Sequence, residues 1–478
     1  MKKKHIFQTV IFTVVIMIVI GLTGSAYALM VPGLPDIFEV GGYIQNETSI
    51  RTSKPSEILW SENRFQLDVL TKIVPEKCYL YFSGLFYYDA VYDMQQGYGY
   101  LSHGDARKEL RQLLAFNRAD TLADPIREAY LDLSLWKLDM RLGKQQIVWG
   151  ETDAFKMLDI VNPTDIRHFN QDVWENSRIT LWSAKFDYNV NENSQLQFIL
   201  IPDIEPMPSA FLMGMGHPFT PLAFRNLPPF PFITHDVKKT IGNTEWGFRW
   251  YQNFGNFNYT LNYFQHWTDS PGAYLDLKKF KIDLKYKKMH SIGGSGSWNF
   301  SNFLGLKHVV WRFETVLNLK DVQSAINYAM GGLPETVRSD NLSYALVMDK
   351  TFYRPYILWP SGLSFTFELF QTYILDYEDN KHERYYTVGQ TGKHADEVET
   401  ILAAIFTSSY LPGEYLTPTL LVAYKDDGDW WISPSLAYSL TEKITATVGL
   451  NYYTGPFDGL IGEFHKSSNV MFRLKYGF

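Results

Sequence analysis

The final ten residues of the chain, 469–478, read NVMFRLKYGF. Apolar side chains occupy every second position, namely Val470, Phe472, Leu474, Tyr476 and Phe478. The positions between them are mostly polar or small: Met471, Arg473, Lys475 and Gly477. Successive side chains of a β-strand point to opposite faces, so this period of two predicts a strand with one apolar face. Soluble sandwiches and membrane barrels both contain such strands, so the pattern alone does not separate them.

The same period recurs along most of the chain. The stretches RFQLDVLTKIV at 64–74, KFKIDLKYK at 279–287 and LSFTFELF at 363–370 all alternate apolar with polar side chains. Residues 245–264, EWGFRWYQNFGNFNYTLNYF, predict a hairpin that turns at 253–256. These patterns indicate an all-β protein whose sheet has two chemically different faces.

The N-terminal residues predict export. A basic start, MKKKH, is followed by an apolar run at 6–22 and by Ala26-Tyr27-Ala28, a small-x-small cleavage site. This order is typical of a secretory signal peptide, so we assign residues 1–28 to a signal peptide and 29–478 to the exported domain. No later stretch offers about eighteen consecutive apolar residues, so we expect no membrane-spanning helix.

Composition narrows the class of protein further. Aromatic residues make up 16% of the chain, yet the mean hydropathy is only −0.18, which suits a sheet with one apolar and one wet face. The formal charge is −7 and becomes −10 without the three Lys of the signal peptide, which argues against a nucleic-acid partner. The single cysteine, Cys78, excludes an internal disulfide.

Together, the signal peptide, the strands of about ten residues, the aromatic faces and the final Phe478 predict a closed antiparallel transmembrane β-barrel. The terminal strand resembles the assembly signal of Gram-negative outer-membrane barrels. That resemblance implies the bacterial outer membrane as location, and outer-membrane lipid and the barrel assembly machinery as partners. About nineteen candidate strands are found, but the pattern of loop lengths conflicts between residues 268 and 305, so one candidate there is wrong. Because a closed bacterial barrel needs an even number, we expect roughly 18 strands, with 16 as the alternative.

Residues 141–169, RLGKQQIVWGETDAFKMLDIVNPTDIRHF, interrupt the strand pattern. Residues 140–149 predict a strand that leaves the sheet at Gly150. We expect a short helix over 163–175, with Pro163 at its first position, Asn162 as N-cap and Asp165 in its first turn. The strand pattern resumes with SRITLWSAKFDY at 177–188. A loop and helix inserted between two barrel strands in this way commonly fold inward and narrow the barrel.

This block, followed by NSRITLW and LQFILIPDIEPMP, resembles the family of Gram-negative exported proteins called domain of unknown function 1302. Later stretches, HVVWRFETVLNL and NLSYALVMDKTF, resemble its later strands. The resemblance covers most of the exported chain and implies an outer-membrane barrel, often accompanied by an efflux-type permease. The chain has Lys144 where the family pattern suggests Arg, and His168 where it suggests Glu.

The charged residues of the block are the first candidate site. A channel constriction lined by opposed acids and bases would select solutes by size and charge. The alternative is a network of ion pairs and caps that fixes the insert to the wall, and the two roles are compatible. The constriction or lumen candidates are Trp149, Glu151, Asp153, Asp159, Asn162, Asp165, Arg167 and Arg178.

Residues 202–240 form the second candidate, because this stretch is rich in proline, methionine and phenylalanine. Proline prevents regular strand pairing, and so long an apolar loop should not lie open to water. We expect it to fold into the lumen or cover the mouth, either as an apolar-ligand contact or as a packed lid without a ligand role. Its candidate contacts are Met207, Phe211, Met213, Met215 and Phe219.

We therefore expect a channel or transporter for small solutes, hydrophobic or amphipathic ones among them. The alternative is a non-catalytic sheath or partner subunit of an envelope export or electron-transfer complex. No nucleophile-elbow, Walker, dinucleotide or zinc-protease motif occurs, and Glu151 with Asp153 lacks an identifiable substrate cleft, so we expect no catalysis. The spacing of the histidines predicts no metal site, and no motif calls for a cofactor.

Overall fold

The computed structural model describes residues 37–91, 125–205, 218–220, 232–276, 278–327, 333–353, 362–375, 377, 384–386, 394–410 and 413–478. The predicted signal peptide at 1–28 lies outside these residues, as do Met207, Phe211, Met213 and Met215. Within the described ranges, no helix is long and apolar enough to span a membrane.

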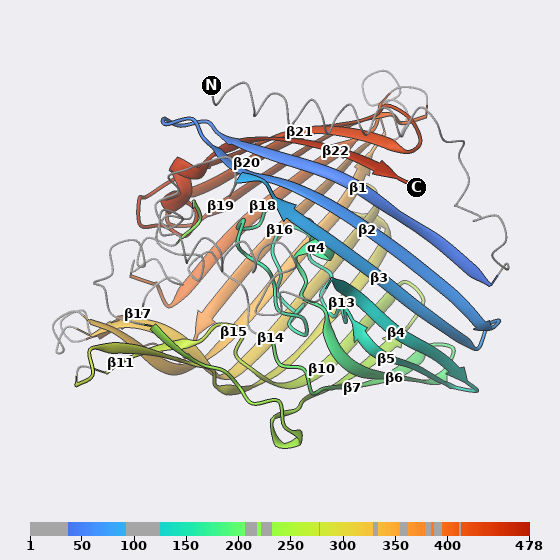
Figure 1. Ribbon diagram of the computed structural model, residues 1–478, viewed down its shortest axis with the longest axis horizontal. Coiled ribbons are helices and arrows are strands. Elements are labelled where there is room, and N and C mark those ends of the chain that lie inside the picture. The colour runs from blue at the N-terminus through green and yellow to red at the C-terminus, as the bar shows by residue number, and fades with distance from the viewer. Residues whose placement is uncertain are drawn as a thin grey trace.

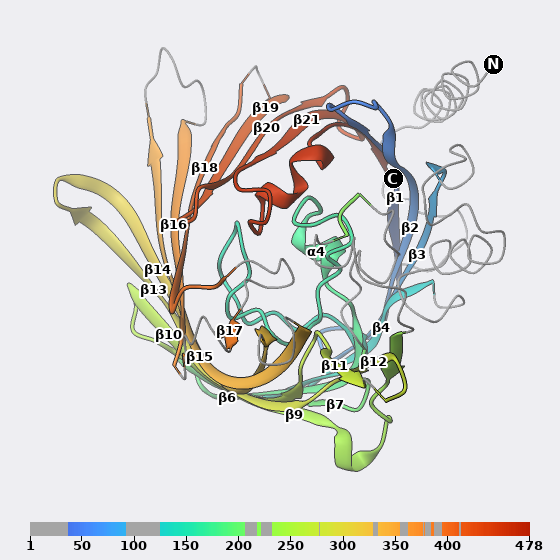
Figure 2. The same ribbon diagram turned by 90° about the vertical axis from the view of Figure 1, so that its left-hand side faces the viewer.

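The described residues form a closed antiparallel barrel of 18 strands (Figures 1 and 2). Its strands are β1 (Phe38–Arg51), β2 (Ile58–Val74), β3 (Cys78–Asp89), β4 (Ile126–Leu135), β5 (Leu138–Gln145), β6 (Leu181–Asn191), β7 (Ser194–Ile201), β9 (Glu245–Asn253), β10 (Phe257–Trp267), β13 (Lys288–Phe303), β14 (Leu306–Asn327), β15 (Leu333–Phe352), β16 (Leu363–Ile374), β18 (Val398–Ser408), β19 (Leu416–Lys425), β20 (Asp429–Ser439), β21 (Ile444–Thr454) and β22 (Asn469–Gly477). The terminal strand closes the barrel, because β22 pairs with β1 from Tyr43↔Gly477 to Arg51↔Asn469.

The two faces of the wall differ as the period of two predicts. Large apolar side chains point outward and stay accessible, such as Leu261, Trp298 and Phe472, which are 52%, 48% and 50% exposed. The inward positions carry buried polar side chains, among them Glu314 on β14 and Glu368 on β16. A polar lumen inside an apolar outer surface is the arrangement that a barrel in a lipid bilayer requires.

The excess strand candidate is the one that starts near residue 278. Residues 281–285 form β12 (Lys281–Lys285), which pairs with β11 (Gly272–Asp276) and β8 (Phe232–His235) in a separate three-stranded sheet. Ile282, Asp283 and Leu284 are all buried in this small sheet, so the alternation of the sequence is not matched by an alternation of exposure there. The period of two is common to any two-faced sheet, and five residues are too few to cross a membrane.

The prediction for 163–175 was wrong in its secondary structure. Within the described residues 146–180, a helix is found only at α4 (Trp174–Ser177), and β5 ends at Gln145 rather than at Gly150. Asn162 does not cap a helix, because its side chain bonds the backbone at both ends of the block. Residues 146–180, named here the lumenal insert, lie inside the ring of strands (teal in Figure 2).

The barrel ends differ in their connections. Short turns join β4 to β5 and β6 to β7, whereas the long connections, including the lumenal insert, lie at the other end. Residues 455–468, which join β21 to β22, also belong to the long-loop end and are named here the terminal loop. The terminal loop contains the short helix η5 (Gly462–Ser467), drawn in red inside the ring in Figure 2.

Candidate functional site: the lumenal insert and its anchors

Asn162 ties the two ends of the lumenal insert together. Its side-chain oxygen accepts a hydrogen bond from the backbone N–H of Ile147 at 2.7 Å, and its side-chain nitrogen donates to the carbonyl of Ile179 at 2.6 Å. The Ile179 N–H in turn donates to the carbonyl of Pro163 at 2.8 Å. These three hydrogen bonds therefore hold together the two segments through which the insert leaves and re-enters the wall.

Two wall carboxylates hold the far side of the insert. Glu314 on β14 accepts hydrogen bonds from the backbone N–H groups of Thr152 at 3.1 Å and Leu158 at 2.9 Å, and also from Glu151. Glu368 on β16 accepts from the N–H groups of Asp153 and Ala154, both at 2.8 Å. A buried peptide N–H needs a partner, and a carboxylate is a stronger acceptor than a neutral oxygen. These two residues therefore fix the insert at β14 and β16, well across the ring from its own strands.

Arg312 joins the insert to the wall where both are accessible. Its guanidinium lies 2.5 Å from Asp153 of the insert and 2.7 Å from Asp349 on β15, and it also donates to the carbonyl of Glu151. The Asp153 side chain is 49% exposed and that of Asp349 is 28% exposed. This ion-pair triad combines opposite charges with access to water, as a charged constriction needs.

Trp149 and Glu151 lie against the wall rather than in open space. The Trp149 side chain is 1% exposed, donates to Gln197 Oε1 at 2.7 Å and packs edge-on against Phe264 at 5.7 Å. Glu151 Oε1 accepts from Ser295 Oγ of β13 at 3.2 Å. The structure therefore gives Trp149 a packing contact, and it positions Glu151 beside β13.

Asp159 and Arg178 form an ion pair within the insert. Arg178 Nε lies 2.7 Å from Asp159 Oδ2, and Lys156 Nζ lies 3.2 Å from the same oxygen. Burial lowers the pKa of Lys156 below its ordinary value, against the opposing effect of Asp159. Because all three side chains are largely buried, this cluster stiffens the insert.

The other side of the insert contacts the wall at β2. Asp172 accepts from Arg64 at 2.7 Å, and Arg64 also pairs with Glu62 at 2.6 Å. His168 stacks on Trp60 with ring centroids 4.4 Å apart. Asp165 and Arg167 pair with each other at 2.6 Å. The insert thus spans the lumen from β2 to β14 and β16.

An aromatic cluster fills the space between the insert, the terminal loop and β16–β21. Phe155 packs edge-on against Phe370 at 5.6 Å, and Phe169 contacts Phe464 at 5.1 Å and Tyr453 at 5.7 Å. Phe219, from the proline-rich stretch, is 2% exposed and contacts Phe464 at 5.5 Å. Phe219 therefore packs in the lumen, whereas the other four candidates from that stretch lie outside the described residues.

The structure brings Glu151 and Asp153 to the junction with Arg312, and it groups Asp159 with Arg178 elsewhere in the insert. Three residues of the site were not predicted from the sequence: Arg312, Glu314 and Glu368. Each of these residues places a charged side chain in the middle of the inward face of a predicted strand. This pattern could have indicated them, because a charge in that position needs a partner in the lumen. Within the ranges that the structure describes, no three His, Cys, Asp or Glu side chains are arranged to hold a metal ion.

Comparisons place this geometry among known proteins. A sequence profile of the family described as "Protein of unknown function (DUF1302)" matches residues 60–478. A search of curated proteins gave no match. The fold is similar to the crystal structure of Acinetobacter baumannii OccAB2, with a TM-score of 0.51 and 10% identity over 93% of this chain and 98% of that chain.

Two further solved structures have the same fold. Acinetobacter baumannii OccAB1 has a TM-score of 0.50 and 9% identity over 95% of this chain and 99% of that chain. Pseudomonas aeruginosa OpdL has a TM-score of 0.50 and 10% identity over 93% and 99%. At these identities the similarity establishes the barrel fold.

Proposed function

The chain belongs to the DUF1302 family, and we propose that it is an outer-membrane channel through which small solutes, hydrophobic and amphipathic ones among them, pass without catalysis. The physical basis is the contrast between the two faces of the wall. An apolar outer face is stable in lipid, and barrels of 16–18 strands are wide enough to leave an aqueous passage. The lumenal insert then determines how much of that passage remains.

The triad of Arg312, Asp153 and Asp349 is the observation that carries the proposal. It lies where the insert meets the wall, and its carboxylates are partly exposed. Fixed charges of both signs at a narrowing orient dipolar solutes and exclude large ones. Partly buried rings on the same insert, Phe155 and Phe169, support passage of solutes with an apolar part.

The proposal includes location and assembly. We infer export through residues 1–28 and insertion into the outer membrane through β22, with the long-loop end facing the cell exterior. Phe478 supports a role of the terminal strand, because its backbone pairs with Gly42 and its ring stacks on Phe65 at 6.2 Å. An efflux-type permease or other envelope complex would then be an additional partner.

Single-channel recording of the purified chain in a planar lipid bilayer tests the proposal. We expect stable conductance steps from the chain alone, and an altered step size for Asp153→Asn. Glu442→Gln, which changes a charge in the exposed turn between β20 and β21, is the matched control and should leave the steps unchanged. Absence of conductance without a co-purifying partner would contradict the proposal and favour a sheath subunit, and lipid hydrolysis by the pure chain would contradict both.

A further inference from the structure

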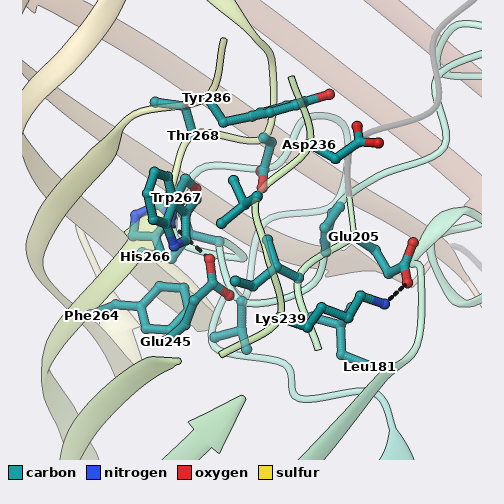
Figure 3. A pocket seen from close by; sticks show the side chains of 16 residues that line it. Leu181, Glu205, Asp236, Lys239, Glu245, Phe264, His266, Trp267, Thr268 and Tyr286 are labelled. Atoms are coloured by element: carbon teal, nitrogen blue, oxygen red, sulfur yellow. Dashed lines mark hydrogen bonds and ion pairs between the residues drawn. The ribbon is translucent and has the colours of Figure 1, made fainter. Parts of the chain in front are cut away.

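A cavity of about 160 Å³ lies between the lumenal insert, the wall at β6, β9 and β10, and the segments around the small sheet (Figure 3). It is about the size of an engineered protein cavity that accommodates benzene. Ile160, Leu181 and Phe264 form part of its apolar lining. The cavity therefore has room for one ring or a short alkyl chain, and apolar walls to contact it.

Glu245 supplies the polar feature of this cavity. Its side chain is only 7% exposed, and Figure 3 shows its carboxylate directed at the space between Phe264 and Lys239. One carboxylate oxygen accepts the backbone N–H of Trp267 at 2.7 Å. Among the described residues, the second oxygen has no hydrogen-bond partner. A buried carboxylate is costly without compensation, so a donor or cation entering the cavity would be stabilised there.

The charges around the cavity favour a cation. The lining contains the carboxyl groups of Glu205, Asp236, Glu245 and Asp269 but a single ammonium, that of Lys239. Lys239 already bonds Glu205 and Asp203, both at 2.6 Å, so it is shared between two acids. Burial raises the pKa of Asp269 to about 7, against the opposing effect of Lys156.

We propose that this cavity binds a small organic cation, a primary amine with one ring or a short alkyl body, whose ammonium group contacts Glu245. The ring or chain lies against Phe264, Leu181 and Ile160, and the ammonium donates to the carboxylate oxygen that faces the cavity. This inference deepens the proposed function and rests on it, because a solute must reach the lumen to occupy the site. The cavity lies at the long-loop end, so it would be the place where such a solute is first held.

Binding of three matched probes to the detergent-solubilised chain tests the proposal by calorimetry. Benzylamine, benzyl alcohol and benzoate share a ring but differ in charge. We expect benzylamine to bind at least about tenfold more tightly than the other two, which corresponds to about 1.4 kcal/mol. If benzyl alcohol bound as tightly as benzylamine, the positive charge would contribute nothing to binding. If benzoate bound most tightly, the cavity would prefer an anion. Either result overturns the proposal.

Two variants test separately the contribution of the Glu245 charge and that of the cavity volume to binding. Glu245→Gln should remove most of the preference for benzylamine, and Ile204→Trp, which fills the cavity from its lining, should abolish binding of all three probes. Glu57→Gln removes an exposed carboxylate that pairs with Arg51 and should leave binding unchanged. Circular dichroism verifies that each barrel is folded. Because calorimetry needs no conductance, a chain that binds benzylamine but conducts no current would refute the channel and leave the site standing.

Discussion

The lumenal insert and the terminal loop are held in the barrel by the same kind of hydrogen bond. They differ in how far around the ring the anchoring strand lies from the strands that flank each segment. In both, buried wall carboxylates accept backbone N–H groups. Asp429 on β20 accepts from Ile461 at 2.9 Å and from Gly462 at 3.0 Å, both in the connection that follows the neighbouring strand β21. Glu314 and Glu368 instead bind an insert whose own strands are β5 and β6, far around the ring. The first arrangement pins a loop to its own wall, whereas the second fixes a segment across the lumen.

Local geometry sharpens the contrast. The terminal loop wraps Asp429 so closely that a Cβ at Gly462 would lie 2.7 Å from its Oδ1, and one at Gly459 would lie closer still. The insert also meets the wall closely, because a Cβ at Gly293 would lie 2.7 Å from Leu158 Cδ1. Its backbone, however, is held by the long side chains of Glu314 and Glu368. We infer that the terminal loop thickens one side of the barrel, while the insert sets the size of the passage.

Deleting the insert should have the largest effect. Gln145 and Leu181 are paired neighbours on β5 and β6, so a short turn can replace residues 146–180 without a change in wall register. The expected result is a several-fold larger single-channel conductance, because an unobstructed barrel of this size is an open pore. Replacing residues 456–461 of the terminal loop is the comparison, and an equal increase there would contradict the assignment of the constriction.

Removing the two anchors should have the next largest effect. Glu314→Ala with Glu368→Ala leaves buried N–H groups of the insert without acceptors, and each lost anchor costs about 1.5–3 kcal/mol. We expect frequent opening transitions in the recordings and faster proteolysis within the insert. Asp429→Ala should expose the terminal loop to protease while leaving the conductance steady. Steady conductance in the double variant would refute the anchoring role.

Changing the charge of the triad should have a smaller effect. Arg312→Gln removes the cation that pairs with both Asp153 and Asp349, so the junction becomes more negative. The reversal potential in a salt gradient should shift toward cation selectivity by a measurable amount. Arg51→Gln, in a partly exposed pair with Glu57, provides the control and should leave selectivity unchanged. A shift toward anions would contradict the placement of the triad in the path.

Coupling between the two lumenal segments should be the smallest effect. Phe169 of the insert and Phe464 of the terminal loop have ring centroids 5.1 Å apart. A double-mutant cycle of Phe169→Ala and Phe464→Ala, followed by urea unfolding in detergent, should give a coupling of about 0.5–1.5 kcal/mol. Strict additivity would mean that the two segments pack independently.

The sequence was sufficient for the barrel because each wall strand repeats one physical constraint, apolar outside and polar inside. The terminal strand and the 245–264 hairpin are clear cases, and their pairing is confirmed in β22 and in β9 with β10. The stretch at 279–287 satisfies the same alternation in a different sheet, so local pattern could not exclude it.

The interior was harder to predict, because its contacts join residues far apart in the chain. The sequence around Asn162 predicts a helix cap, but its side chain instead bonds the backbone of Ile147 and Ile179 at the two ends of the insert. Glu314 and Glu368 lie more than a hundred residues from the backbone they bind. Such pairings depend on which strands face each other across the closed ring, and that information is absent from any local stretch.

The most direct test of the central claim is chemical modification at Asp153 during recording. The chain has a single cysteine, so Cys78→Ser with Asp153→Cys offers one thiol at the junction of insert and wall. A charged methanethiosulfonate reagent should reduce the current of an open channel in a single step as the thiol reacts. Complete labelling, verified by mass spectrometry, with no change in current would show that the junction lies outside the conduction path and would contradict the account.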